Sequence, residues 1–255
     1  MTNMSNLAYA GKIGEIVERI DETQAGNIKA AAEICAEVIA GGKLVHLFGS
    51  GHSVLMIQDM FPRYGGVVGW HPLMDPRLMW DNVIRGGGAR EVLWIERQEG
   101  YIANFLQSYN LQAGEAIVVY SHGGLNAAPV EAALYAKERG LKVIVVNCGD
   151  NFKKAKATHS SGKMLGDVAD VYIDNCCPLE DALVEIPGYH QRVGASSTVA
   201  AMIVTQSLAS ETALLLEQKG HKMHIFVSPN VTEVPPGYMH EVYDAYTDLV
   251  RRNGN

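Results

Sequence analysis

The chain has 255 residues, of which 47% are apolar, and its formal net charge is −7. This length and apolar share fit one large α/β domain with a sizeable core. The acidic balance and the lack of a basic run argue against nucleic acid or an anionic membrane surface as a partner. Four cysteines without a C-x-x-C pair favour reduced thiols, so we expect a cytoplasmic protein. Early acidic residues and short apolar runs predict neither a signal peptide nor a membrane span.

The first half of the chain alternates between helical and β-type patterns. Apolar residues three and four apart predict helices, and short apolar runs predict strands. One stretch with two prolines, three consecutive glycines and several charges interrupts this alternation, and connections of that length are often functional. In chain order we expect a helix at 7–40, a strand at 43–48, a helix at 53–65, a strand at 66–70, the irregular stretch at 71–100 and a helix at 101–111.

The second half shows the same alternation more clearly. Runs rich in Val and Ile predict strands, and the helical segments include one long, strongly apolar helix. In chain order we expect a strand at 115–120, a helix at 126–139, strands at 141–147 and 167–175, a helix at 196–219, one more strand at 221–229 and a closing helix at 240–252.

This order of elements predicts the fold class. Short β-rich runs that alternate with helices are typical of a parallel sheet built from βαβ units. We expect an α/β fold of three layers, with a doubly wound, mostly parallel, flavodoxin-like sheet of five strands and helical extensions at both termini. The sequence shows no internal repeat or linker, so we expect a single domain over 1–255, with its core at about 25–220 and the segments 7–40 and 221–252 packed on it.

Four predicted loops at one end of the sheet are unusually polar and rich in glycine. Ligands of an open parallel sheet bind outside the carboxyl ends of its strands, where these loops lie. Hydroxyl groups and free N–H groups near helix N-termini favour an anion such as phosphate. The candidate substrate-binding residues are Ser50, Gly51, His52, Ser53, Ser121, Gly123, Gly124, Asn126, Ser160 and Ser161.

The motif GSGHSV at 49–54 has two alternative interpretations. A dinucleotide fingerprint would need a third glycine in place of Val54 and an acid at the end of the second strand, whereas Asp75 follows only beyond a proline. A plain tight turn is the other alternative. We favour an anion-binding loop, because the second loop, at 121–126, repeats the combination of hydroxyl, glycines and a following helix.

These motifs resemble the SIS (sugar isomerase) domain family. The βαβ unit YSHGGLNAAPVEAALYAKERGLKVIVV is similar to the family's strand, S-x-S-G-x-T loop, helix and second strand, GSGHS resembles its first phosphate loop, and GKMLGDVADVYID resembles its segment before the last strand. The resemblance covers roughly residues 25–220. Phosphosugar-binding members share three further patterns: ER..GY at 96–101, HSSGK at 159–163, and a proline followed by DA at 178–182.

The resemblance implies the SIS form of the fold and a phosphorylated sugar as ligand, bound by a homodimer or homotetramer without a cofactor. Members isomerise aldoses and ketoses, cleave ethers or amines from sugar phosphates, or only sense sugar phosphates. Two departures stand out: Gly123 replaces the second serine of the S-x-S-G-x-T loop and Asn126 replaces its threonine. We therefore expect either weaker phosphate binding or a different anion, for example a sulfonate. The Glu and His that phosphoheptose isomerases carry on the helix after the last strand are absent from SSTVAAMIVT.

The nine histidines divide by position. His46 lies within a strand and is predicted to pack in the core, whereas His221 and His224 are predicted at the surface. Three others fall in loops at the predicted binding end, where we expect at least one to be functional. No H-x-E or C-x-x-C pattern accompanies them, so we predict no metal site. These loop residues are His52, His122 and His159.

Aldose–ketose isomerisation through an enediol is the reaction we expect. It needs a base that moves a proton between adjacent carbons and a group that polarises the carbonyl. Glu96 is the predicted base, although it could instead pair with the adjacent arginine or cap a helix. His159 is the predicted polarising group, with His122 as the next candidate and Glu180 and Asp181 as alternative acids. A non-catalytic sugar-phosphate sensor, a SIS-type lyase or deglycase, and a nucleotide-dependent oxidoreductase remain alternatives.

The apolar segment VAAMIVTQSLASETALLL predicts a partner for the chain. A helix that is apolar on all sides must be covered by the sheet, by the helix predicted at 7–40, or by another chain. We therefore expect a homo-oligomer.

Overall fold

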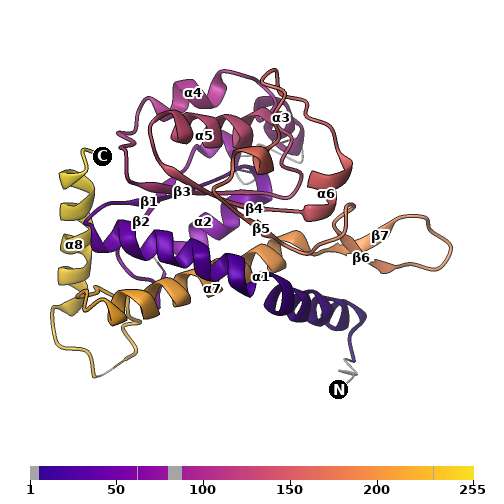
Figure 1. Ribbon diagram of the computed structural model, residues 1–255. Coiled ribbons are helices and arrows are strands. Elements are labelled where there is room, and N and C mark those ends of the chain that lie inside the picture. The colour runs from indigo at the N-terminus through magenta and orange to yellow at the C-terminus, as the bar shows by residue number, and fades with distance from the viewer. Residues whose placement is uncertain (1–5, 62, 80–87, 232) are drawn as a thin grey trace.

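A five-stranded parallel sheet forms the centre of the molecule (Figure 1). The computed structural model describes residues 6–61, 63–79, 88–231 and 233–255. The strand order is β2-β1-β3-β4-β5, and every neighbouring pair in this sheet is parallel. This arrangement confirms the predicted α/β fold. The strands are β1 (Val45–Gly49), β2 (Trp70–Leu73), β3 (Ala116–Ser121), β4 (Lys142–Asn147) and β5 (Val171–Asp174).

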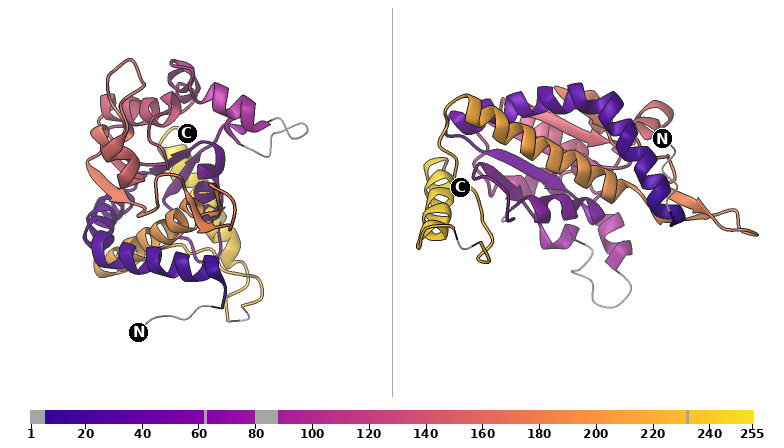
Figure 2. Two further views of the ribbon diagram at one scale, coloured as in Figure 1. Left: turned by 90° about the vertical axis from the view of Figure 1, so that its right-hand side faces the viewer. Right: turned by 90° about the horizontal axis from the view of Figure 1, so that it is seen from below.

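Helices cover both faces of the sheet, so its central strands are apolar on both sides. In β3, Val118 and Tyr120 belong to one core, whereas Ile117 and Val119 belong to the other, as the alternation of side chains along a strand requires. Figure 2 shows two long helices side by side beneath the first face. That face is covered by α1 (Ala8–Ala40), α2 (Val54–Met60) and α7 (Ser197–Gln218), and the other by α4 (Tyr101–Leu106) and α5 (Ala127–Glu138).

The predicted helical extensions are present at both termini. The N-terminal one is α1, which packs along α7. The C-terminal one is α8 (Tyr238–Arg252), whose Tyr246 ring stacks on His71 of the edge strand β2 at 6.5 Å between centroids. Asn253 Nδ2 donates to the carbonyl of Gly42, just before β1, at 3.1 Å. Thus α8 lies at the amino ends of the strands, opposite the predicted ligand end (Figure 1).

One apolar run is longer than expected from the sequence. Among the described residues, α7 is 22 residues long and is apolar enough, by length and composition alone, to cross a bilayer. In the fold its buried residues pack against α1, α2 and the first core. A core helix can pass the same test of length and composition, so this finding is weak evidence for a membrane span.

Several element boundaries differ from the prediction. The second strand begins at Trp70 rather than ending there. It includes Pro72, which lacks a backbone N–H; an edge strand tolerates proline because its outer side forms no hydrogen bonds with another strand. The strand predicted at 221–229 is reduced to one antiparallel bridge between Ile225 and Val67. The predicted helices at 53–65 and 101–111 are shorter. Elements that the sequence did not predict are α3 (Gly88–Ile95), α6 (Gly149–Lys154) and the antiparallel hairpin of β6 (Ala182–Glu185) and β7 (Arg192–Ala195).

Candidate functional site

The strand order fixes where a ligand fits. The chain leaves β1 for β2 on one side, while β3 pairs with β1 on the other, so the loops after β1 and β3 lead to helices on opposite faces of the sheet. Open parallel sheets bind ligands in a crevice at such a point, and we use the word crevice for this position. Gly49, the last residue of β1, pairs with Tyr120 of β3. The two predicted anion-binding loops, 50–53 and 121–126, therefore start side by side at this crevice.

The loop after β1 is a tight turn that glycine makes possible. Residues Gly51–Ser53 form a 3-10 turn that leads into α2, and Gly51 has a φ of 60°. A Cβ at Gly49 would lie 2.7 Å from the carbonyl oxygen of Ser53, so a larger residue would force the turn open. Ser53 is buried by this turn, whereas Ser50 and His52 are half-buried and face the neighbouring loops.

The loop after β3 is held by internal hydrogen bonds. The Ser121 hydroxyl accepts from the Gly124 N–H at 3.0 Å, and Gly124 has a φ of 66°. Asn147, at the end of β4, donates through Nδ2 to the carbonyls of Ser121 at 2.8 Å and His122 at 2.9 Å. Sequence reasoning missed this buried amide, although a polar residue that ends an otherwise apolar strand is a usable signal. By contrast, a Cβ at Gly123 would meet open space.

Glu96 joins the two loops. Its Oε2 accepts from the Ser50 hydroxyl at 2.6 Å and its Oε1 accepts from Asn126 Nδ2 at 2.7 Å. Its carbonyl accepts from the Ala128 N–H in the first turn of α5 at 2.9 Å. Asn126 occupies the N-cap position of α5, but its side chain binds Glu96 instead of capping the helix.

The environment of Glu96 makes it easier to protonate. The side chain is 6% exposed, and burial raises the pKa of its carboxyl group, against the opposing effects of the Ser50 hydrogen bond and the Arg97 charge. The carboxylate of Glu96 makes its hydrogen bonds to the two loops, so Glu96 is not simply a surface partner of Arg97. A buried carboxyl group beside a ligand crevice is suited to proton transfer.

The third predicted loop packs beside the second. The Thr158 hydroxyl donates to the carbonyl of Leu125 at 2.7 Å, and the Leu165 N–H donates to the carbonyl of Gly124 at 2.9 Å. This loop carries His159, Ser160 and Ser161, and both serines are exposed.

His159 has acidic neighbours. Its Nδ1 lies 2.8 Å from the Ser161 hydroxyl, and its Nε2 lies 3.6 Å from Glu131 and 3.8 Å from Glu99. The Ser160 N–H and hydroxyl both donate to Glu99. His159 Nε2 is buried without a hydrogen-bond partner among the described residues. His159 is therefore held among carboxylates of the α4–α5 side, and its predicted role stays a prediction.

The loop after β5 brings the remaining predicted residues near the crevice. His122 Nε2 lies 3.3 Å from the carbonyl of Leu179, and its Nδ1 is buried without a hydrogen-bond partner in the described part of the chain. Asp181 binds the start of α7 and is linked through Ser197 to His52. Glu180 is exposed and pairs with Arg192 of β7 at 3.1 Å.

Other titratable groups lie away from this crevice. His46 is fully buried, as predicted, and contacts His71 and Glu115. Asp75 is bound by the Arg77 guanidinium and the Tyr101 hydroxyl, so its oxygens are already engaged. Across the described ranges, no group of three or more His, Cys, Asp or Glu side chains is arranged to hold a metal ion.

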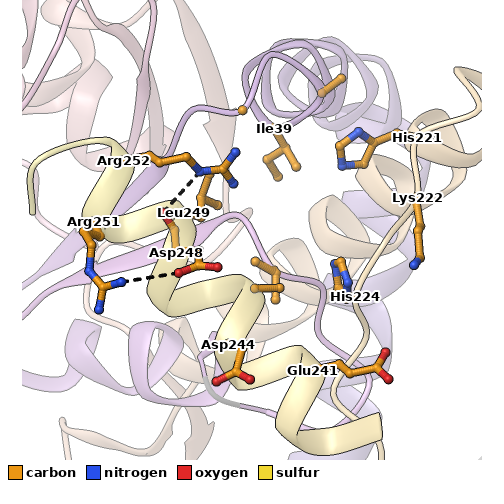
Figure 3. Close-up of a pocket in the computed structure, with 14 residues that line it drawn as sticks. Ile39, His221, Lys222, His224, Glu241, Asp244, Asp248, Leu249, Arg251 and Arg252 are labelled. Carbon is orange, nitrogen blue, oxygen red and sulfur yellow. Dashed lines mark hydrogen bonds and ion pairs between the residues drawn. The ribbon is translucent and has the colours of Figure 1, made fainter.

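A pocket of about 950 Å³ lies at the opposite end of the molecule, between α8, the end of α1 and residues 221–224. Acidic side chains of α8 face His221, Lys222 and His224 across it (Figure 3). It contains none of the loops at the carboxyl ends of the strands. We therefore place the candidate site at the crevice between β1 and β3, where glycine-rich loops and a buried carboxyl group meet.

Comparisons with known proteins concern the family and the fold. The family model described as SIS domain matches residues 8–148. A UPF0309 protein of Caldanaerobacter subterraneus is 35% identical over 226 residues, which cover 88% of this chain and 90% of that protein. A UPF0309 protein of Thermoanaerobacter pseudethanolicus is 34% identical, with 88% of this chain and 91% of that protein covered.

Solved structures share the fold at low identity. Phosphoheptose isomerase from Neisseria gonorrhoeae has a TM-score of 0.53 at 12% identity, over 81% of this chain and 96% of that chain. A phosphoheptose isomerase from Francisella tularensis has a TM-score of 0.54 at 12% identity, over 80% of this chain and 94% of that chain. Both likenesses concern the arrangement of the sheet and its helices.

Proposed function

The chain belongs to the SIS domain family, and from this membership and the geometry of the crevice we propose that it binds a phosphorylated or otherwise anionic sugar and interconverts its aldose and ketose forms. The observation that carries the proposal is Glu96, a buried carboxyl group bonded to both glycine-rich loops at the switch point of the sheet. A phosphate group held by these loops would place the carbons of its sugar within a few ångströms of that carboxylate.

The anion site we propose is built mainly by the loop after β3. The Ser121 hydroxyl and the backbone at Gly123 are half-buried at the crevice, next to the N-terminus of α5. Helix N-termini and hydroxyl groups favour phosphate. Ser50 and Asn126 already donate to Glu96, so we assign them to holding the base rather than to binding the anion.

In the isomerisation, Glu96 accepts the proton from the carbon next to the carbonyl. The electrons of that C–H bond form the C=C bond of the enediol, and the electron pair of the former C=O bond moves to oxygen. Glu96 then returns its proton to the adjacent carbon. A carboxylate whose pKa is raised by burial is a stronger base than one in water and suits this transfer.

The decisive experiment combines binding and turnover of a panel of aldose and ketose phosphates and sulfosugars. Ligand at a hundred times its dissociation constant should stabilise the chain by about 2.7 kcal/mol in a thermal melt. Turnover is followed by NMR in D2O, because each proton transfer at carbon exposes the proton to exchange with solvent. Glu96→Gln should lower turnover by roughly 10² or more while ligand still raises the melting temperature.

Glu91→Gln is the matched control, because Glu91 is an exposed carboxylate on α3, five residues earlier. It should leave turnover unchanged. Full turnover by Glu96→Gln would contradict the assignment of the base. Binding without turnover or exchange by the unmodified protein would identify a sugar-phosphate sensor instead of an isomerase.

We also propose that the chain acts in the cytoplasm as one domain and as a homo-oligomer. Leu214 and Val199 leave 57% and 36% of their surface exposed on α7, and Leu55 of the adjacent α2 is 46% exposed. This apolar surface supports a contact with a second copy. A monomeric mass by light scattering at micromolar concentration would contradict the homo-oligomer, and Leu214→Glu should weaken it.

A further inference from the structure

Two sequence patterns that the proposed mechanism leaves partly unexplained lie against each other in the fold. The pattern ER..GY at 96–101 spans the turn between α3 and α4, and HSSGK at 159–163 lies in the loop that follows α6. Glu99 Oε1 accepts from the Ser160 N–H at 2.8 Å, and the Ser160 hydroxyl donates to Glu99 Oε2. The turn that carries Glu96 is therefore bonded to a loop 61 positions further along the chain.

These bonds form one side of a triangle of contacts between three segments. Glu96 Oε1 accepts from Asn126 Nδ2 at 2.7 Å, which joins the turn to the loop after β3. The carbonyl of Leu125 in that loop accepts from the Thr158 hydroxyl at 2.7 Å, which joins it to the 158–163 loop. Each of the three segments is thus held by the other two, so the turn cannot move away from the loop after β3 without breaking a second contact.

A carboxylate of α5 supports the same turn. Glu131 accepts from the N–H groups of Gly100 and Ile102, at the start of α4. His159 Nδ1 accepts from the Ser161 N–H at 3.1 Å, so the imidazole carries its proton on Nε2. This Nε2 lies 3.6 Å from Glu131. The 158–163 loop therefore presents a hydroxyl, a backbone N–H and an imidazole N–H to the carboxylates that surround the turn.

The position of the turn decides how much water reaches Glu96. Its side chain is 6% exposed, and burial is the largest cause of its raised pKa, against the Ser50 hydrogen bond and the Arg97 charge. A turn that moved outward would let water reach the carboxylate, and the pKa of Glu96 would fall towards its ordinary value. The other ionisable groups on the contacting segments are Glu99, Tyr101, Glu131, His159 and Lys163.

We propose that Thr158 and Ser160 are positioning residues, through which the 158–163 loop keeps Glu96 buried and bonded to the loop that binds the anion. They act through Leu125 and Glu99 rather than on the substrate. Ser160 thereby receives a different role from the substrate contact that the sequence predicts. The effect on turnover rests on the proposed isomerase function, whereas the effect on the burial of Glu96 does not.

The first measurement needs no substrate. The carbon NMR signals of the glutamate carboxyl groups are followed against pH, and the signal absent from Glu96→Gln is assigned to Glu96. The variants are Thr158→Val and Ser160→Ala, singly and together, and neither substitution changes the charge of the chain. Thr247→Val and Ser210→Ala are the matched controls, because their exposed hydroxyls also donate to backbone carbonyls but lie on α8 and α7. Circular dichroism and thermal melts check that each variant folds.

We expect Glu96 to titrate at lower pH in the double variant than in the unmodified chain, because water reaches its carboxylate. On the panel of sugar phosphates, kcat should fall by roughly tenfold because the base is misplaced, while KM stays within about twofold because the loop after β3 still binds the anion. The single variants should show smaller changes in the same direction. Ser160→Thr keeps both donors to Glu99 and should match the unmodified chain, as should the two controls.

Two outcomes would overturn the proposal, and they differ from failure of the proposed function. If Glu96 titrates alike in the double variant and the unmodified chain, the 158–163 loop does not control its burial; should the double variant fail to fold, the single variants decide this. A raised KM with unchanged kcat in Ser160→Ala would make Ser160 a substrate contact. If the unmodified chain turns over no member of the panel, the isomerase proposal falls, and the titration alone decides the positioning role.

Discussion

The two ends of the sheet each hold a buried cluster of carboxylate and imidazole groups, and they differ in access. At the amino ends, Glu115 and His46 are fully buried and His71 is 6% exposed beneath Tyr246 of α8. At the carboxyl ends, Glu96 is joined to half-buried loops that border the crevice. The same residue types therefore serve packing at one end and, we propose, proton transfer at the other.

The contrast also appears in the sign of the pKa shifts. Burial and then the His46 charge lower the pKa of His71 to about 4, so this ring stays neutral in the fold at physiological pH. Burial raises the pKa of Glu96, so its charge is disfavoured by folding. The cluster at the amino ends should therefore make the fold less stable in acid. By contrast, ionisation of Glu96 at neutral pH should lower the stability of the fold. Both statements can be tested by denaturation.

The largest effect on stability should come from Glu115→Ala. Glu115 Oε2 accepts from the Gln112 N–H at 2.7 Å and lies 3.0 Å from His46 Nε2. Its loss leaves a buried imidazole nitrogen and a backbone donor unpaired and opens a cavity, which should cost about 3 kcal/mol or more. Urea denaturation measures the loss.

Glu241→Ala is the control for this substitution, since Glu241 is exposed on α8, and it should change stability by less than about 0.5 kcal/mol. Turnover per folded molecule should be unchanged in Glu115→Ala. A fall in turnover that exceeds the fall in folded protein would show that the two ends of the sheet are coupled.

The next effect is the pH dependence of stability that His71 causes. Its folded pKa of about 4 lies below the unfolded value of 6.5, so its contribution is fully present above pH 6.5 and is lost as pH falls towards 4. Each pKa unit corresponds to about 1.4 kcal/mol, so the loss over this window is about 3 kcal/mol. Urea midpoints of the unmodified chain and His71→Gln between pH 7 and 4 isolate this contribution, because carboxylates that titrate in the same range are common to both. Parallel curves for the two proteins would contradict it.

A smaller effect of opposite sign is expected at Glu96. Because the folded pKa of Glu96 is raised, its contribution to stability is present below the unfolded pKa and is lost as pH rises through the folded pKa. Glu96→Gln should therefore be at least as stable as the unmodified chain at pH 7, while it loses turnover. A clear loss of stability at pH 7 would mean that the bonds to Ser50 and Asn126 outweigh the cost of the buried charge.

The sequence was sufficient to predict which loops lie together at the carboxyl ends of the strands, but not the contacts between them. Apolar strands followed by Ser and Gly mark the loops after β1 and β3, and strand order then forces these loops together. The bond between His52 and Ser197 joins residues 145 positions apart, and Asn147 reaches Ser121 across 26 positions. Such pairings depend on the packing of α7 and β4 and leave no local pattern. The β6–β7 hairpin was missed for a related reason, because β7 is exposed and has no buried face.

The loop after β3 offers the finest comparison, between two adjacent glycines. Gly123 stands where the family pattern has a serine; a Cβ there would meet no atom within 4 Å, and its φ is not positive. Gly124 has a φ of 66°, and its Cβ would lie 2.6 Å from Asn147 Nδ2, the amide that holds the loop carbonyls. Only the first position can accept a side chain without strain.

We therefore expect Gly123→Ser and Gly124→Ser to act in opposite directions. The new hydroxyl at 123 can donate to the bound anion, and a hydrogen bond to a charged group is worth about 1.5 kcal/mol, or roughly a tenfold tighter affinity. Serine at 124 must displace Asn147 or distort the turn, so it should weaken binding and lower the melting temperature. Calorimetric titration with one sugar phosphate, or with inorganic phosphate where no sugar is yet identified, measures both. Equal loss of affinity in the two variants would mean that the space beside Gly123 is needed by the sugar and that the anion sits elsewhere in the crevice.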